Sequence, residues 1–200
     1  MTKSRLVFIE PIHTYMLDGK ILPSATQIIQ EILPNKYDGI SEEVLHKKAE
    51  FGTKGHSIIE HLDISDLDKA KEEVNEIDNI KLQICIEEYL RLVGKYKIEK
   101  PKHELMVHYK DIYAGTLDMI AKVNEINSLI DIKFTSKLDK EYLSWQLGLY
   151  ELAYGKKFKK HYCLFLPKGE LGQLVEIEIK TEKEIIDKLI ELGYMEVKND

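Results

Sequence analysis

The sequence is poor in cysteine, in long apolar runs and in positive charge. Its 200 residues include two cysteines, Cys85 and Cys163, which excludes a disulfide framework and a four-cysteine metal cluster. No segment reaches the ~20 apolar residues of a membrane span. The N-terminus also lacks the apolar core and cleavage site of a signal peptide. These absences predict a protein of a reducing cytoplasm that neither enters a membrane nor is exported.

The charge balance is acidic, with 29 Lys and Arg residues against 35 Asp and Glu residues and a net charge of −6. A protein that coats nucleic acid through its overall field is typically basic, so that class is disfavoured. Basic clusters nevertheless occur at 46–48, 95–102 and 156–161. The plain interpretation of each cluster is a solvated face, and local contact with phosphate stays open.

The length and composition predict one domain. With 44% apolar and 32% charged residues, a chain of this size can bury a single core, and its five scattered prolines mark no linker. We divide the single domain 1–200 into a hairpin and helix at 1–40, a helical region at 41–100, a sheet with a helix at 101–180, and a C-terminal helix at 181–200. The expected fold class is α/β, with a central mixed sheet flanked by helices.

Apolar periodicity and end signals place the expected elements. Asp18-Gly19 marks a hairpin turn, Ser24 with Gln27 a capping box, and Gly155 a helix stop. The expected helices are 24–34, 41–62, 80–96, 141–155 and 181–193, and the expected strands are 103–109, 112–123, 128–135, 161–167 and 174–179. Residues 63–78 read as a loop leading into a helix.

Three details of the helical region are also predicted. Gly52 and Gly55 should loosen or kink the second helix, and Pro101 should close the third helical segment. The apolar face of that third helix is expected to carry Ile80, Ile84, Tyr89 and Val93.

Two acids, Asp118 and Asp131, stand inside apolar segments that otherwise read as strands. Burying an unpaired carboxylate is costly, so these acids either face solvent at a strand end or surround something positive. Lys133 shares a face with Asp131 because alternate residues of a strand point the same way. Across a hairpin turning at 124–127, Asp118 lies roughly opposite Asp131. The same Asp-x-Lys spacing at Asp18 is explained by its turn alone.

A divalent cation would relieve the repulsion between the two carboxylates. Mg²⁺ takes oxygen ligands and keeps several waters, and Lys133 would lie beside such a water to orient it or help remove its proton. Such a site suits hydrolysis of a phosphodiester. The plain alternative is a buried ion pair between Asp131 and Lys133, with Asp118 at a strand end.

Several short motifs in chain order strengthen the cation interpretation. They are G-x-x-x-H at Gly52 and His56, G-x-x-D at Gly115 and Asp118, D-x-K at Asp131 and Lys133, and Q-x-x-x-Y at Gln146 and Tyr150. Together with the opening "HTYMLDGKILPSAT", this order resembles the PD-(D/E)XK nuclease superfamily, in its RecB-like and phage recombination exonuclease branch. The resemblance covers about residues 13–155 and implies a restriction-endonuclease-like core.

The resemblance also implies roles for individual residues. Asp118, Asp131 and the Ile132 carbonyl would bind Mg²⁺ or Mn²⁺, and His56 would complete the shell, with Glu60 holding its second nitrogen. Lys133 would be the catalytic lysine, and Glu104 a second metal or water ligand. Gln146 and Tyr150 would touch the DNA phosphate or the lysine. The alternatives are an ordinary helix histidine for His56 and core packing for Tyr150, and His61 reads as a surface residue.

The function that the resemblance implies is metal-dependent hydrolysis of DNA. We expect an exonuclease that trims linear ends in recombination or repair, in a bacterial or phage-infected cell. DNA is the expected partner, with a single-strand annealing protein, a helicase or further copies of the chain as additional ones. No iron–sulfur cluster is expected, because the four cysteines of cluster-binding relatives are missing. An endonuclease on branched or foreign DNA, and a DNA- or partner-binding module without catalysis, stay open as alternatives.

Overall fold

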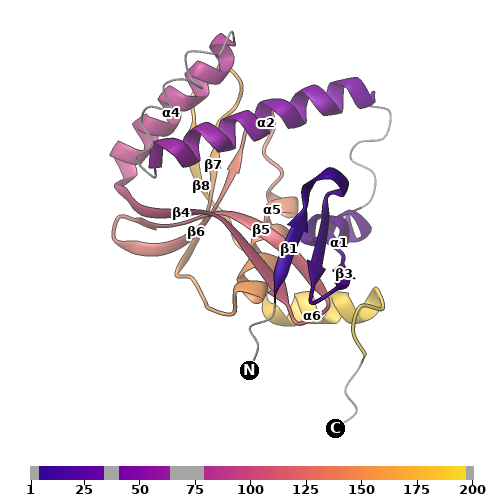
Figure 1. The fold of residues 1–200 in the computed structure, drawn as a ribbon. Coiled ribbons are helices and arrows are strands. Elements are labelled where there is room, and N and C mark those ends of the chain that lie inside the picture. Colours follow the sequence, from indigo (N-terminus) through magenta and orange to yellow (C-terminus); the bar gives the residue numbers. More distant parts are fainter. Residues whose placement is uncertain (1–4, 34–40, 64–78, 197–200) are drawn as a thin grey trace.

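A mixed five-stranded sheet forms the centre of the molecule. The computed structural model describes residues 5–33, 41–63 and 79–196. The strands of the central sheet are β4 (Ile98–Tyr109), β5 (Tyr113–Val123), β6 (Ile126–Lys133), β7 (Lys160–Phe165) and β8 (Gln173–Glu176), in that spatial order. Helices α2 (Glu42–Asp63) and α4 (Ile80–Tyr96) lie on one side of it, and α5 (Lys140–Tyr154) and α6 (Glu182–Glu191) on the other (Figure 1). The predicted α/β class is therefore confirmed.

The direction of each strand follows from its connection. Strands β4, β5 and β6 are joined by short turns and are antiparallel. Helix α5 carries the chain back over the sheet, so β7 lies parallel to β6, as a helical crossover requires. The register of β5 and β6 pairs Met119 with Ile130, which places Asp118 and Asp131 next to each other one residue further along.

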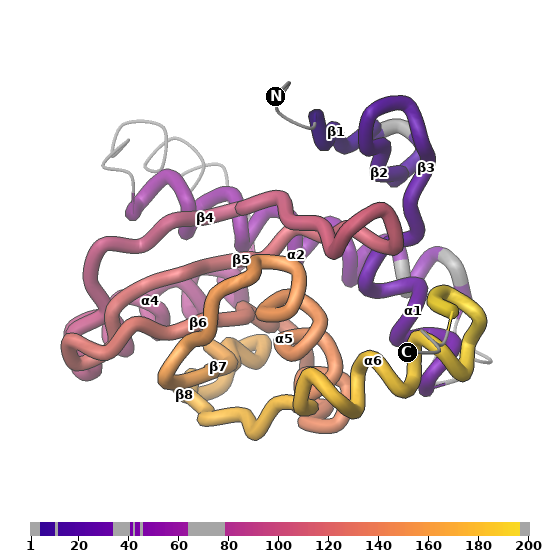
Figure 2. The backbone as a smooth tube through the Cα atoms, turned by 90° about the horizontal axis from the view of Figure 1, so that it is seen from below, coloured from indigo at the N-terminus to yellow at the C-terminus, as the bar shows by residue number. Residues whose placement is uncertain are grey.

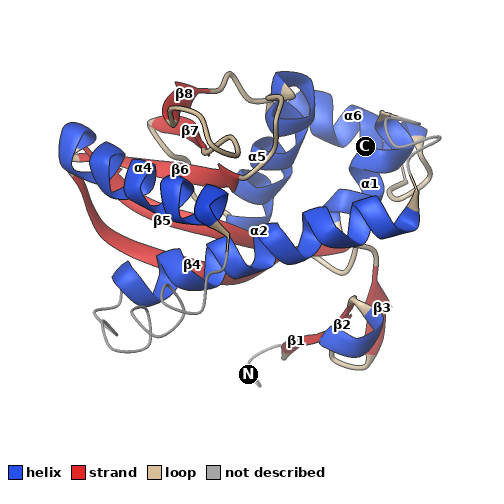
Figure 3. Ribbon diagram, turned by 90° about the horizontal axis from the view of Figure 1, so that it is seen from above, coloured by secondary structure: helices blue, strands red, loops and turns tan. Residues whose placement is uncertain are grey.

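A separate three-stranded sheet stands at the N-terminal end (Figure 3). It contains β1 (Leu6–Ile9), the 3₁₀ turn at Glu10–Ile12, β2 (Thr14–Leu17) and β3 (Lys20–Leu22). The predicted hairpin is present, with Asp18 and Gly19 in left-handed conformations, but β1 was not predicted. Helix α1 (Ala25–Ile32) follows, with the predicted capping box between Ser24 and Gln27.

The helices on the α2 side differ from prediction in three details. Helix α2 runs unbroken through Gly52 and Gly55, and α4 buries Leu82, Cys85, Ile86, Tyr89 and Leu92. Ile80, expected on the buried face, is 66% exposed. Pro101 does not end α4. That helix ends at Lys97, which has a left-handed conformation, and Pro101 lies inside β4. The predicted loop and helix at 64–78 lie outside the described residues.

The core consists of two main clusters separated by the sheet. Side chains from α2, α4 and one sheet face form the first, which includes Ile58, Tyr89 and Met119. Side chains from α1, α5, α6 and the other face form the second, which includes Leu117 and Leu147. Figure 2 shows α6 beside α5 in this second layer. Within the described ranges, no helix has the length and apolar content needed to cross a membrane.

Candidate metal centre

Three side chains from three elements meet at one end of the sheet. His56 of α2, Glu104 of β4 and Asp118 of β5 each offer a ligand atom, and these atoms lie within 4.8 Å of one another. The His56 Nδ1 atom is 3.8 Å from Glu104 Oε1 and 3.9 Å from Asp118 Oδ2. Ligands at 2.0–2.6 Å from one cation are separated by up to about 4–5 Å, so the spacing fits a single ion.

Helix α2 positions His56 through the glycine before it. A Cβ atom on Gly55 would lie 2.4 Å from the Cζ atom of Phe134, so only glycine lets the helix approach the end of β6 this closely. The Phe134 ring then contacts the His56 ring edge to face, with centroids 5.6 Å apart. Gly55 therefore has a packing role, whereas Gly52, the glycine of the predicted motif, has open space around it and no such role.

Glu104 reaches the centre because the ladder is irregular at this point. The β4–β5 register pairs His103 with Met119 and Leu105 with Leu117, which sets Glu104 opposite Asp118. Glu104 has a φ of 48°, in the left-handed region that a glutamate rarely adopts. Such backbone strain persists only where the surrounding structure imposes it, and it gathers at functional sites. The sequence carries no signal for this conformation.

Asp131 and Lys133 form a buried pair beside these three residues. Lys133 Nζ is 2.8 Å from Asp131 Oδ1, and the Asp131 side chain is 1% exposed. The second carboxylate oxygen of Asp131, Oδ2, is buried and has no hydrogen-bond partner among the described residues. An orphaned buried carboxylate oxygen is costly and is the kind of atom that a cation or an ordered water would satisfy.

The backbone of Ile132 connects the pair to the other ligands. Its N–H donates to Asp118 Oδ2 over 2.7 Å. The backbone of Ile132 also lies close enough to His56 to be a lesser cause that raises the pKa of the ring, and since the N–H is already used, the carbonyl is the group that acts on His56. This is the carbonyl that the resemblance assigns to the metal.

Helix α5 places Gln146 and Tyr150 over the same end of the sheet. Gln146 Nε2 donates to the Tyr150 hydroxyl over 3.3 Å, while the buried Gln146 Oε1 atom has no partner in the part of the chain that the structure describes. Burial, followed by the negative charge of Asp118, raises the pKa of Tyr150. Gly115 makes room for this tyrosine, because a Cβ there would lie 2.6 Å from its Cε1 atom. Tyr150 therefore packs in the core and also borders the acidic residues.

The electrostatics favour a bound cation. Burial, followed by the charges of Asp118 and Glu60, raises the pKa of Glu104 to about 7. Burial lowers the pKa of His56, and Asp118 only partly offsets this, so the ring is a neutral ligand at pH 7. Burial also raises the pKa of Asp131, whereas for Lys133 the charges of Asp131 and Asp118 outweigh burial and raise the pKa. Lys133 is therefore an ammonium.

Two expectations near the centre are not met. Among the described residues, His56 approaches Glu104 and Asp118 and not Glu60, whose charge instead acts on Glu104. His61 was expected at the surface but is 8% exposed, because the last turn of α2 packs against the sheet. That packing includes an unpredicted cluster in which Asp63 accepts a hydrogen bond from the Tyr89 hydroxyl and lies 2.7 Å from His103 Nε2.

The N-terminal sheet also contributes a residue to this region. The Tyr15 hydroxyl is 2.8 Å from Thr116 Oγ1, and burial, with the charge of Glu104 among the lesser causes, raises the pKa of Tyr15. The Ala114 N–H donates to the Pro23 carbonyl over 3.0 Å, which fixes the sheet's exit against the start of β5. The opening motif is therefore attached to the strand that carries Asp118.

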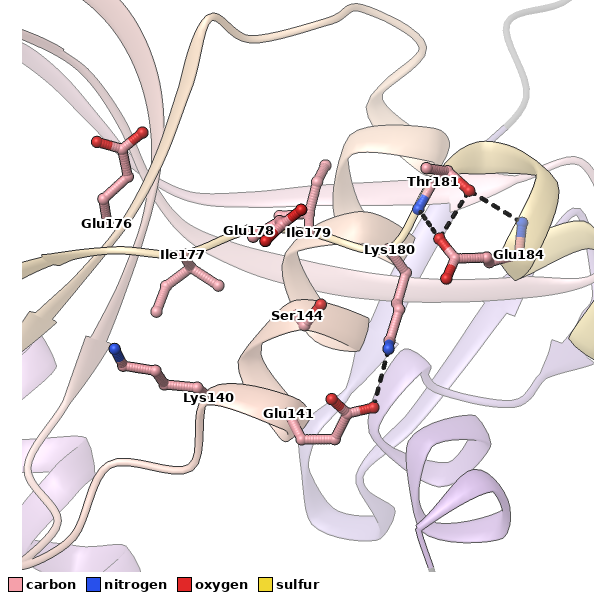
Figure 4. A pocket seen from close by; sticks show the side chains of 10 residues that line it. All are labelled: Lys140, Glu141, Ser144, Glu176, Ile177, Glu178, Ile179, Lys180, Thr181 and Glu184. Atoms are coloured by element: carbon pink, nitrogen blue, oxygen red, sulfur yellow. Dashed lines mark hydrogen bonds and ion pairs between the residues drawn. The ribbon is translucent and has the colours of Figure 1, made fainter.

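A separate pocket lies elsewhere and has a different character. It has a volume of about 500 Å³ and is lined by α5 and the segment leading into α6 (Figure 4). Several of its charged groups already have partners. Lys180 Nζ is 3.0 Å from Glu141 Oε1, and Glu184 Oε2 accepts the backbone N–H of Thr181. None of the predicted site residues lines it, so it is not the candidate site.

Comparisons with known proteins leave the family open. No family model matches the chain, and no curated protein matches it. Among solved structures, the crystal structure of SSO0001 is similar over 86% of this chain and 85% of that chain, with 14% sequence identity and a TM-score of 0.36. A likeness this weak carries no argument about activity.

Proposed function

We propose that the protein is a metal-dependent DNA nuclease. The observation that carries the proposal is the convergence of His56, Glu104 and Asp118 beside the buried Asp131–Lys133 pair. A core without this role has no reason to gather acids that repel one another around a strained glutamate and an orphaned carboxylate oxygen.

The donor set fits a hard divalent cation. His56, Glu104 and Asp118 would hold it, with Asp131 Oδ2 and the Ile132 carbonyl as adjacent donors. Because one donor is an imidazole nitrogen, Mn²⁺ suits the site at least as well as Mg²⁺. When bound, the ion supplies Lewis-acid activation of water and neutralises charge on the phosphate.

Residues of the chain would orient the water, hold the metal ligands in place and contact the substrate. Lys133 stays charged beside Asp131, so it orients water or offsets charge on a phosphate oxygen and is not poised to accept a proton. The N–H of Ile132 fixes one oxygen of Asp118. Gln146 has a free carbonyl oxygen and Tyr150 a hydroxyl that can turn toward a substrate entering from the α5 side.

The preferred reaction is exonucleolytic trimming of linear DNA in recombination or repair. This preference rests on the motif resemblance, which also suggests an annealing protein or helicase as partner and an assembly of several copies. An endonuclease would use the same centre, and a binding module would leave it idle.

One experiment separates these functions. The protein is incubated with Mg²⁺ or Mn²⁺ and end-labelled linear duplex, single-stranded and closed circular DNA. We expect progressive loss of linear DNA with circles spared. Nicked or linearised circles would show an endonuclease instead, and if neither metal supports cleavage while Lys133→Ala still binds DNA, the binding module replaces the proposal.

A further inference from the structure

A second pocket gathers lysines that are far apart in the sequence. It has a volume of about 360 Å³ and lies where β4, β5 and the end of α5 meet. Five lysines line it: Lys100, Lys102, Lys122, Lys156 and Lys157. Two of the basic clusters that read separately as solvated faces are thus brought together. We call this site the lysine pocket.

The charge of the lysine pocket is mostly uncompensated. No acidic residue lines it, and of the five lysines only Lys157 forms an ion pair within the described part of the chain, with Glu151 Oε1 at 3.2 Å and Glu182 Oε2 at 3.6 Å. Four unpaired ammonium groups around one concavity repel one another. In a protein of net charge −6 this local excess favours an anionic ligand.

Two aromatic rings form part of the pocket wall. The Tyr154 and Phe158 rings lie with centroids 5.3 Å apart and an interplanar angle of 33°, and both side chains are half-buried. Glu151 holds the loop that carries Phe158 in place. Its Oε2 atom accepts the backbone N–H of Phe158 over 2.8 Å and lies 2.8 Å from His161 Nε2. The pocket is therefore formed before any ligand arrives.

The lysine pocket and the metal centre are built on the same stretch of β5. Asp118 meets His56 of α2, whereas Ile120, in the pocket wall, packs in the cluster on the α5 side of the sheet. At ~3.3 Å per residue, the Cα atoms of Asp118 and Lys122 are about 13 Å apart. On β4, Lys102 stands two residues before Glu104. A bound DNA segment of a few nucleotides is therefore long enough to reach both sites.

We infer that the lysine pocket binds a single-stranded segment of DNA that leads away from the metal centre. Lysines bind the phosphates as point charges, and an aromatic pair binds the face of an unstacked base. A duplex keeps its base faces stacked and hidden, so the rings favour a single strand. The choice of DNA as the ligand rests on the proposed function, whereas the preference for an unpaired strand rests on the pocket itself.

The test measures binding in EDTA, without cleavage. Fluorescence anisotropy with a labelled 12-nucleotide single strand and a 12-base-pair duplex is recorded over a salt series. For Lys122→Gln with Lys156→Gln, we expect the slope of log K against log salt for the single strand to fall by about 1.4, at ~0.7 per lost phosphate contact. The control, Lys47→Gln with Lys183→Gln, changes the net charge equally at distant exposed sites and should leave the slope unchanged.

A second variant tests the rings. Phe158→Leu keeps an apolar side chain in the wall but removes the ring, and we expect single-strand binding to weaken at least ~5-fold, with an unchanged melting temperature as the folding control. Equal losses in the two double variants, or a duplex bound as tightly as the single strand, would overturn the inference. A protein that binds in this way but never cuts would refute the proposed function alone, and one that cuts while both pocket variants bind normally would refute only this inference.

Discussion

Glu104 is one of the residues whose protonation is predicted to change near neutral pH. Its pKa is raised to about 7 by burial and by neighbouring acids, and its backbone is strained. Nothing in "KHELMV" distinguishes it from an ordinary strand glutamate, so the sequence supports it only as a second metal or water ligand. Its place among the three clustered donors depends on pairing across the strands.

Glu104→Gln should stabilise the metal-free fold at high pH. In the folded chain this carboxyl holds its proton up to about pH 7, whereas in the unfolded chain it loses the proton near its ordinary, lower pKa. The folded state therefore binds more protons in this window, and stability falls as pH rises through it. We expect the variant in EDTA to melt ~1–3 °C higher at pH 8 and equally at pH 4.5, a modest effect because the side chain is 45% exposed.

With metal present, Glu104→Gln should melt lower than the unaltered protein at pH 8, the opposite of the result in EDTA. Mn²⁺ should raise the melting temperature of the unaltered protein at pH 8 but raise that of Glu104→Gln much less, because a ligand is lost. A variant that melts lower than the unaltered protein in EDTA at pH 8, or that gains equally from Mn²⁺, would contradict the assignment of Glu104.

At the scale of elements, short sequence motifs predicted the features that depend on neighbouring residues, namely the helix ends and the turns. The capping boxes of α1 and α6 and the left-handed Gly155 after α5 appear as predicted, because caps depend on residues three or four apart. The hairpin that pairs β5 with β6 likewise set Asp118 beside Asp131. Strand β1 and the buried face of α4 could not be predicted in this way, because pairing with β2 and packing on the sheet decide them.

Helix α2 offers a matched pair of glycine substitutions. Gly52→Ala should stabilise the protein by about 0.5–1 kcal/mol, since alanine favours the helix and open space surrounds the position. Gly55→Ala should destabilise it by about 1–3 kcal/mol, because the new Cβ meets the Phe134 ring and pushes α2 away from the sheet. Urea denaturation measures both free energies of unfolding.

The same pair separates packing from metal binding. Displacement of α2 moves His56, so Gly55→Ala should also weaken Mn²⁺ binding, while Gly52→Ala should not. Equal stability of the two variants would show that the close approach of α2 to Phe134 is not what positions His56.

At the scale of the whole molecule, the sequence predicted the class of fold but not how distant segments meet. The α/β architecture followed from the order of periodic segments, and the predicted site residues converge from α2, β4, β5, β6 and α5. The convergence of Lys100 and Lys156 in one pocket could not be predicted, because nothing local relates the two clusters. An acidic protein can in this way gather basic charge in one pocket.

The most direct test of the central claim is the rate of DNA cleavage by Asp118→Asn with Mn²⁺, under single-turnover conditions. Asp18→Asn is the matched control, because Asp18 has the same Asp-x-Lys spacing but lies in the β2–β3 turn. We predict that the unaltered protein and Asp18→Asn cleave linear duplex within about twofold of each other, and that Asp118→Asn is at least ~100-fold slower, as loss of a metal ligand implies. Cleavage by Asp118→Asn at the full rate would contradict the account.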